Sequence, residues 1–308
     1  MDTTLLLIPD IAMILIGFAL RRGTDWSVSF WDGLERLVYF VLFPSLLFIS
    51  ILRAPLRPAE HGPAVAIALC CMLAGILLAA LARRILRPEP GQFAAGAQCA
   101  FRFNSYIGLA LAQRLGGTEG LALCAIVIGF CAGPSNFGAV LPLARARGTR
   151  LAAELARNPL VIATLAGLIG NAFGFVAPGP LDETLRRLGS AAIALGLLSV
   201  GAGLHRNPGA HPSPDLASGW RLGLWLASTK LVVMPALALL AAHGLGLPST
   251  TLMVVVMFNA LPPSSSAYVL ASRMGGDGPY VARLLSASTL ASMLMIPFWL
   301  GMARWVSG

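Results

Sequence analysis

The sequence predicts an all-α membrane protein with ten transmembrane helices, arranged as two inverted five-helix repeats in which helices 4 and 9 are broken. Composition is the first observation: 57% of the 308 residues are hydrophobic, 11% are charged, and the mean hydropathy is +0.78. An average soluble domain carries about 25% charged residues. The other observations are ten successive apolar stretches and a short motif that recurs half a chain apart.

The apolar stretches are long enough, at about 20 residues, for helices that cross the hydrocarbon core of a bilayer. Short connectors join them and leave no room for a soluble domain, so residues 1–308 are expected to form a single transmembrane domain. The expected spans, located by continuous apolarity, are residues 4–20, 34–52, 63–82, 91–113, 120–143, 159–176, 184–203, 219–241, 249–271 and 279–301.

The distribution of positive charge predicts the orientation in the membrane. Fourteen Lys or Arg residues fall in the odd-numbered connectors, against six in the even-numbered connectors and the tail. Because positively charged connectors stay on the cytoplasmic side, both termini are expected outside. Many arginines beside a single lysine suggest a GC-rich bacterial source, hence the cytoplasmic membrane. The same clustering between apolar runs favours the lipid bilayer over nucleic acid as the partner of this basic chain.

An internal repeat links residues 111–117 (LAQRLGG) to residues 270–276 (LASRMGG), which are identical at five of seven positions and offset by 159 residues. Two halves of five spans each must enter the membrane in opposite directions, so the repeats, roughly 1–150 and 151–308, are expected to be inverted. By the same offset Pro263 corresponds to Asn104. Span four is therefore expected to be interrupted at residues 102–106, although it contains no proline.

Pro262 and Pro263 stand together in span nine, where no unbroken helix can contain them. Each lacks an N–H, so the carbonyls of Phe258 and Asn259 lose their helical partners. Broken spans at membrane depth are tolerated where they line a cavity, and many secondary transporters build their substrate site there. Each second half-helix would begin at a good N-cap residue, and its unpaired N–H groups would attract an anion such as a carboxylate.

Arg102 and Lys230 fall near the centres of spans four and eight. A buried cation costs at least about 2.5 kcal/mol at the bilayer centre, so such residues usually face a cavity and a partner. Lys230 could compensate the charge of a substrate or donate to carbonyls of a broken helix. Arg102 could point to an outer vestibule or to the opposite half-helix. The predicted substrate-binding residues are Arg102, Asn104, Ser105, Tyr106, Lys230, Asn259, Pro262, Pro263, Ser264 and Ser265.

Several of these residues also have a purely structural interpretation. Asn104 and the serines could satisfy backbone groups freed at the breaks. Tyr106 could hydrogen-bond a ligand or simply pack. Asp10 is the one carboxylate expected inside a span, which makes it the candidate for ion coupling, although partial burial near the outer end of its helix is the simpler interpretation.

The residues resemble the auxin efflux carrier family, which includes plant PIN carriers and bacterial permeases for dicarboxylates such as malonate and malate. The resemblance covers essentially the whole chain. It rests on residues 39–44 (YFVLFP), 102–108 (RFNSYIG), 158–163 (NPLVIA), 197–204 (LLSVGAGL), 230–235 (KLVVMP) and the two prolines at 262–263.

The resemblance implies a ten-helix inverted repeat like that of bile acid sodium symporters and sodium/proton antiporters, with spans four and nine crossing at unwound centres. It also implies that Asn104 helps to bind a carboxylate. The chain departs from the plant pattern in having Phe103 before that asparagine, where the plant carriers have proline, and in lacking a long loop between spans five and six. Arg102 in place of a neutral residue suggests a more anionic ligand than auxin.

The expected function is therefore a secondary transporter, or permease, for small organic anions such as mono- or dicarboxylates, working by alternating access around a midplane crossover site. A passive anion channel is the alternative. An integral membrane enzyme is less favoured, because the four histidines lie in or beside connectors and the five cysteines have no histidine neighbours. No metal-ligand spacing is present, so no cofactor is expected. The coupling ion stays open, as does the oligomeric state, a homodimer included.

Overall fold

The computed structural model describes residues 3–53, 58–144, 159–204, 216–264, 266–273 and 276–307, and within these ranges it contains helices and no strand. The all-α prediction is confirmed. Helix occupies each of the ten predicted stretches. In the described part of the chain, six segments are long and apolar enough to cross a membrane: Val28–Leu52, His61–Leu86, Pro90–Ala139, Gly179–Gly203, Gly219–Gly244 and Tyr280–Ser307.

The chain forms two compact units, and each takes segments from both halves of the sequence. The first unit comprises Met1–Val65, Ser105–Gly133 and Ala152–His205. The second unit comprises Ala66–Asn104, Pro134–Leu151 and Arg206–Gly308. One of the points at which the chain passes from one unit to the other falls between Asn104 and Ser105, inside the predicted fourth span.

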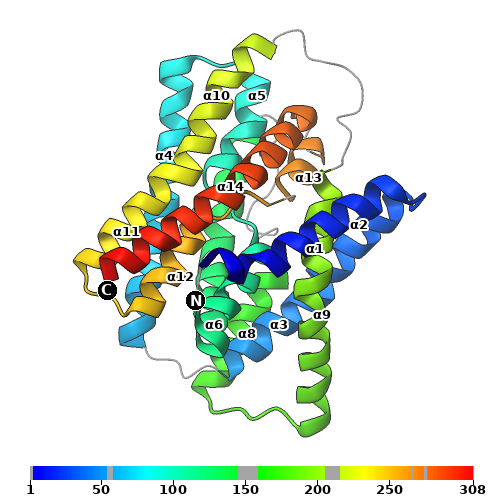
Figure 1. Ribbon diagram of the computed structural model, residues 1–308, viewed down its shortest axis with the longest axis vertical. Coiled ribbons are helices and arrows are strands. Elements are labelled where there is room, and N and C mark those ends of the chain that lie inside the picture. The colour runs from blue at the N-terminus through cyan, green and yellow to red at the C-terminus, as the bar shows by residue number, and fades with distance from the viewer. Residues whose placement is uncertain are drawn as a thin grey trace. The chain divides into compact units, whose positions relative to one another are not determined.

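The helices of the first unit pack around α9, which contacts α1, α2 and α3. In Figure 1, α1 lies across α9. Two glycines permit this crossing, because a Cβ at Gly17 would overlap the Leu198 carbonyl and one at Gly201 would overlap the Ile14 carbonyl. Small residues let membrane helices approach backbone to backbone in this way. The helices are α1 (Thr3–Gly23), α2 (Val28–Leu37), η1 (Val38–Leu42), α3 (Phe43–Leu52), α8 (Pro159–Ala172) and α9 (Gly179–Leu204).

Polar side chains in the first unit satisfy helix ends. The Asn171 amide on α8 donates to the carbonyls of Ile51 and Leu52 at 3.0 and 2.9 Å, at the C-terminal end of α3, where helical donors have run out. The α8 helix itself ends with Gly174 at φ 65°, and Phe175 N–H returns to the Gly170 carbonyl at 2.8 Å. This closes the helix in the manner of a Schellman motif.

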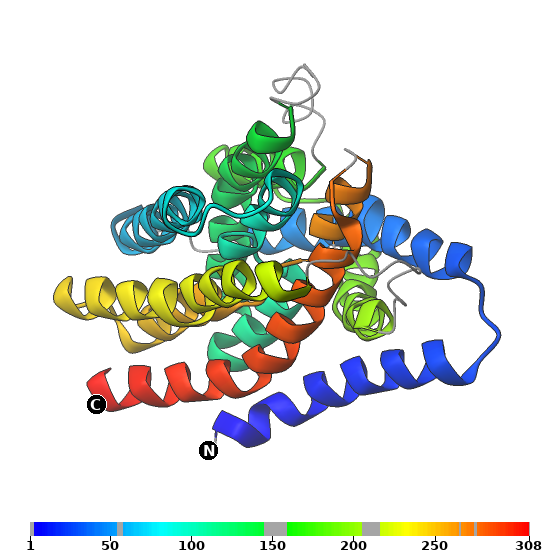
Figure 2. The ribbon, with the colours of Figure 1, turned by 90° about the horizontal axis from the view of Figure 1, so that it is seen from above.

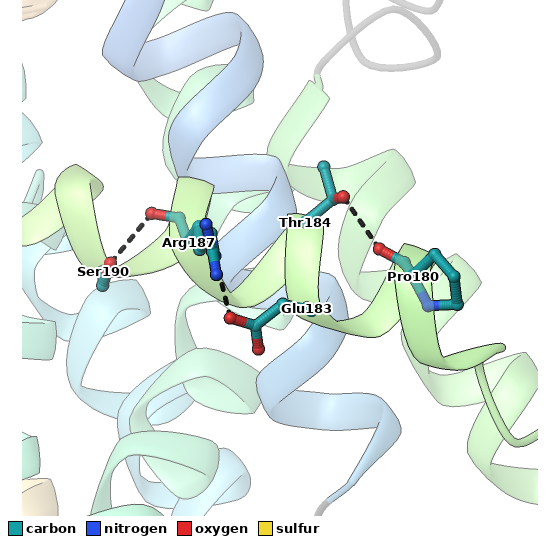
Figure 3. Close-up of polar contacts among 5 residues, drawn as sticks. All are labelled: Pro180, Glu183, Thr184, Arg187 and Ser190. Carbon is teal, nitrogen blue, oxygen red and sulfur yellow. Dashed lines mark hydrogen bonds and ion pairs between the residues drawn. The ribbon is translucent and has the colours of Figure 1, made fainter.

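The charged residues of α9 lie in its first turns, where polar groups interact along the helix (Figure 3). The Arg187 Nε donates to Glu183 at 2.8 Å, and the Thr184 hydroxyl donates to the Pro180 carbonyl at 2.8 Å. Asp182 forms an ion pair with Arg53, which follows α3. The charged groups are thus confined to one end of α9, and the largely apolar remainder is left for packing.

The helices of the second unit surround α14, which contacts α5, α10, α11, α12 and α13. Figure 2 shows α14 beside the α10–α11 segment. Two helices, α4 (Pro58–Leu86) and α6 (Ser105–Ala144), contribute to both units. The other helices are α5 (Pro90–Gly96), η2 (Ala97–Ala100), α10 (Leu216–Ser228), η3 (Thr229–Val233), α11 (Met234–Gly244), α12 (Ser249–Ala260), α13 (Ser266–Arg273) and α14 (Gly278–Ser307).

A turn of π-helix precedes a proline in each unit. The turn η1 ends just before Phe43–Pro44, and η3 ends just before Met234–Pro235. Proline cannot donate to the carbonyl four residues back, so a wider turn lets the helix continue with that carbonyl displaced. The displaced carbonyl of Leu231 accepts a hydrogen bond of 2.8 Å from Trp299 Nε1 of α14.

The repeated motif at residues 111–117 ends in a backbone feature that requires glycine. The helix is interrupted at Gly116 (φ −137°) and Gly117, whose φ of 57° is combined with a ψ of −139°. Side chains rarely allow that combination, whereas glycine does. The Pro90–Ala139 segment, at 50 residues, contains both this kink and the interruption before Ser105. It is too long for one crossing of a bilayer core of about 30 Å.

Candidate functional site

Both predicted interruptions are present. On the first segment, the 3₁₀ turn η2 ends at Ala100, residues 101–104 are not helical, and α6 begins at Ser105. On the second, α12 ends at Ala260, residues 261–264 are not helical, and the described part of α13 begins at Ser266. The two ends lie 160 residues apart, one residue from the repeat offset. The repeat in the sequence therefore located a break that no proline marks.

The two interrupted segments contact each other within the second unit. The backbone N–H of Asn104 donates to the Pro262 carbonyl at 2.8 Å. The rings of Phe103 and Phe258 lie 4.7 Å apart between centroids. Neither backbone group has a helical partner, because Asn104 precedes its helix and Pro262 follows the end of its own. Pairing them removes the cost of two buried unsatisfied groups.

The prolines at 262–263 leave a polar residue buried beside them. Leu261 N–H closes back on the Phe258 carbonyl at 3.4 Å, so that carbonyl regains a donor of 3₁₀ type. Asn259 is fully buried, and its amide nitrogen donates to the Val255 carbonyl at 2.9 Å. Its side-chain oxygen is buried and has no hydrogen-bond partner among the residues that the structure describes. A buried acceptor costs folding free energy unless a hydrogen-bond donor binds it.

Two cations are buried in the second unit. Arg102 is 8% exposed, and its Nη1 donates to the Gln98 side-chain oxygen at 2.8 Å. Lys230 is 1% exposed and lies in η3, which packs against η2, α12 and α14. No Asp or Glu side chain is buried among the residues that the structure describes. The interior of this unit is therefore rich in positive charge.

The other predicted site residues are divided between the two units. Pro262 and Pro263 are buried in the second unit, and Ser264 is partly buried there. Ser105 and Tyr106 belong to the first unit. The Tyr106 ring packs on Phe43 at 4.4 Å between centroids and against Gly196, so it fills part of that unit's core. Ser265 and the side chain of Asp10 lie outside the described residues.

Sequence reasoning missed Gln98, which the structure places between the two interrupted segments. Its side chain is 1% exposed and contacts both Arg102 and Ala267. The available signal was its position four residues before Arg102, a spacing that brings two side chains together wherever the chain is helical. Buried hydroxyls on α14 were also missed: Ser288, Thr289 and Ser292.

In the part of the chain that is described, no three His, Cys, Asp or Glu side chains lie close enough together to hold a metal ion. What the second unit holds at the two helix breaks is instead a set of buried amides and a guanidinium, namely Gln98, Asn104, Asn259 and Arg102, with Lys230 in the adjoining turn η3. Such groups bind anions through hydrogen bonds and charge.

These features define a polytopic helical membrane protein with a polar, cationic centre. The family model described as "Membrane transport protein" matches residues 144–300. That match covers half of the chain, so the protein belongs to this family of membrane transporters, and the resemblance to the auxin efflux carrier family is confirmed.

Relatives of similar length match nearly the whole chain. A Methanothermobacter thermautotrophicus protein named "Uncharacterized transporter" is 25% identical over 97% of this chain and 98% of its own length. The Escherichia coli "Uncharacterized transporter YfdV" is 24% identical over 98% of both chains. A Rhizobium meliloti protein whose name reads "Putative malonate transporter" is 22% identical over 96% of both.

Proposed function

We propose that this membrane transporter is a secondary carrier for small organic anions, with mono- and dicarboxylates as the substrate class and with alternating access around the crossover of its two interrupted segments. One observation carries the proposal: the Asn104–Pro262 hydrogen bond of 2.8 Å joins the two breaks inside a unit that buries Arg102 and Lys230. An organic anion would supply negative charge to this centre, where no Asp or Glu side chain is buried among the described residues.

Hydrogen-bonding capacity supports the same substrate class. Carboxylate oxygens accept strong, short hydrogen bonds from guanidinium, ammonium and amide donors. Arg102 and Asn104 offer such donors on one segment, and Lys230 offers another on η3. A dicarboxylate fits two buried cations better than a monocarboxylate does, and the Rhizobium relative's name points to malonate. Malonate is therefore the first substrate to test.

The proposed transport cycle uses the division of the chain into two units. One of the points at which the chain passes between them falls between Asn104 and Ser105. Asn104, where a substrate would bind, is thus joined by one peptide bond to Ser105, the first residue of the α6 segment that belongs to the other unit. In transporters with interrupted helices, one bundle moves against another around the fixed site. We assign that role to the two units.

The proposal includes ten membrane spans in two inverted repeats, both termini outside, in a bacterial cytoplasmic membrane. Helices in all ten predicted stretches and the excess of arginine in the odd-numbered connectors support this topology. Cysteine labelling from outside intact cells tests it, since cysteines placed near either terminus are expected to react with an impermeant reagent.

Uptake into liposomes that contain the purified protein tests the function. Labelled malonate and acetate are offered under imposed proton, sodium and potential gradients. We expect protein-dependent uptake of malonate that saturates with concentration. Lack of uptake of both anions under every gradient would overturn the proposal. Flux that never saturates, together with single-channel currents, would show a passive anion channel instead.

A further inference from the structure

Gln98 is held by three side-chain hydrogen bonds, all of them within the second unit. Its side-chain oxygen accepts from Arg102 Nη1 at 2.8 Å. Its side-chain nitrogen donates to the Ala95 carbonyl at 2.9 Å and to the Ala267 carbonyl at 3.2 Å. A guanidinium can only donate and a carbonyl can only accept, so these partners leave one orientation for the amide.

The backbone of Gln98 adds to this arrangement. Its carbonyl accepts from the N–H groups of Phe101 at 3.3 Å and Arg102 at 2.9 Å. Both the main chain and the side chain of Arg102 are therefore attached to the same residue. Ala267, the third partner, lies in the first turn of α13, beyond the break that follows α12. Gln98 thus joins the cation to both interrupted segments.

We propose that Gln98 is the positioning residue of the anion site: it fixes the Arg102 guanidinium beside the crossover while leaving its positive charge intact. This inference rests on the proposed function. A neutral amide suits the task, because a glutamate would cancel the charge of Arg102 and would also turn an acceptor oxygen toward the carbonyls of Ala95 and Ala267. Fixed donors bind developing or incoming charge without having to reorganise first.

The contact itself is tested without any substrate, by thermal unfolding of the purified protein. The variants are Gln98→Met, Arg102→Met and the double variant, since methionine keeps length but removes the hydrogen bonds. If Gln98 holds Arg102, the double variant loses less melting temperature than the sum of the two single losses. Additive losses would overturn the proposal regardless of what the protein transports.

The consequence for binding is tested by malonate and acetate uptake with Gln98→Glu and Gln98→Met. In Gln98→Glu the KM for malonate is expected to rise about tenfold or more with the maximal rate nearly kept, because a charged hydrogen-bond partner is withdrawn from the anion. The KM for acetate is expected to rise less. In Gln98→Met the loosened guanidinium raises the malonate KM as well.

Gln92 provides the matched control, because it is a buried glutamine of α5 in the same unit. Gln92→Glu and Gln92→Met are expected to leave the ratio of malonate to acetate KM at the wild-type value. Unchanged malonate KM in both Gln98 variants would overturn the positioning role while the carrier function stands. A wild-type protein that takes up neither anion would instead overturn the proposed function, and the unfolding cycle then decides on Gln98 alone.

Discussion

Asn104 and Pro262 are joined by a backbone hydrogen bond of 2.8 Å, although 158 residues separate them in the sequence. The bond pairs a donor that precedes helix α6 with an acceptor that follows helix α12. Each interruption therefore satisfies the other, and a continuous helix in either place would leave its counterpart unpaired. The bond depends on both breaks, which explains how span four stays open without a proline of its own.

Substitution of Asn104 by alanine removes the side-chain amide and keeps the backbone hydrogen bond to Pro262, so it tests the side chain alone. The variant Asn104→Ala keeps the N–H, so the protein is expected to stay folded, with a melting temperature close to that of wild type. Malonate uptake is expected to fall about tenfold or more, because a hydrogen bond to a charged substrate is lost. Uptake in liposomes and thermal unfolding of the same preparation measure both quantities. Wild-type uptake would exclude a substrate contact by this side chain.

Substitution of Pro262 by alanine tests the second break. In Pro262→Ala the new N–H can donate to the Phe258 carbonyl, so α12 can extend by part of a turn and shift the Pro262 carbonyl away from Asn104. Uptake is expected to fall in protein that still inserts and folds. Pro297→Ala is the control, because α14 runs through Pro297 without a break. Equal effects of the two substitutions would mean that the crossover has no special role.

The sequence predicted the features that follow from local chemistry. The break at Pro262–Pro263 could be predicted because proline lacks an N–H, and the fold class followed from hydropathy. The break at Asn104 was accessible only through the repeat. Gln98 was missed because one of its acceptors, on Ala267, lies 169 residues away. The two interleaved units could not be predicted either, since hydropathy does not distinguish a lipid-facing residue from one packed against protein.

Replacing Lys230 by methionine distinguishes its two possible roles, which are compensation of a substrate's charge and hydrogen bonding to carbonyls of a broken helix. Replacing a buried charge by an apolar side chain of similar length often leaves a protein equally or more stable, because the cost of burying the charge disappears. Lys230→Met is therefore expected to keep or raise the melting temperature while malonate uptake falls and acetate uptake falls less. A lowered melting temperature with a normal KM would show that Lys230 is a structural donor instead.

The hydrogen bond from Trp299 to Leu231 should stabilise the second unit. Pro235 cannot supply the N–H that the Leu231 carbonyl would accept in a regular helix, and Trp299 Nε1 replaces it at 2.8 Å. Trp299→Phe is expected to cost about 1 kcal/mol of unfolding free energy, since hydrogen bonds in membrane proteins are worth roughly that amount. In a Pro235→Ala background the cost is expected to shrink, because the helix regains its own donor.

Trp225 gives the control for this prediction. Its Nε1 donates to the Leu78 carbonyl at 3.0 Å, but Leu78 lies inside α4, where the N–H four residues on already serves that carbonyl. Trp225→Phe is therefore expected to cost less than Trp299→Phe. Equal costs, or a Trp299→Phe effect that Pro235→Ala does not reduce, would show that ring packing rather than the displaced carbonyl determines stability.

The crossing of α1 and α9 predicts that two glycines of the first unit tolerate no side chain. In Gly17→Ala and Gly201→Ala the added Cβ would overlap a backbone carbonyl of the facing helix, and backbone cannot rotate aside as a side chain can. Forcing the helices apart is expected to cost about 1–3 kcal/mol, the range typical of overpacked interiors.

Gly203, on the same helix α9, has nothing within 4 Å of its Cβ position. Gly203→Ala is therefore expected to be neutral or slightly stabilising, because alanine favours helix over glycine. Unfolding of the three variants in one detergent measures the difference, and a Gly203→Ala loss as large as the other two would mean that the close approach of α1 and α9 is not what these glycines provide.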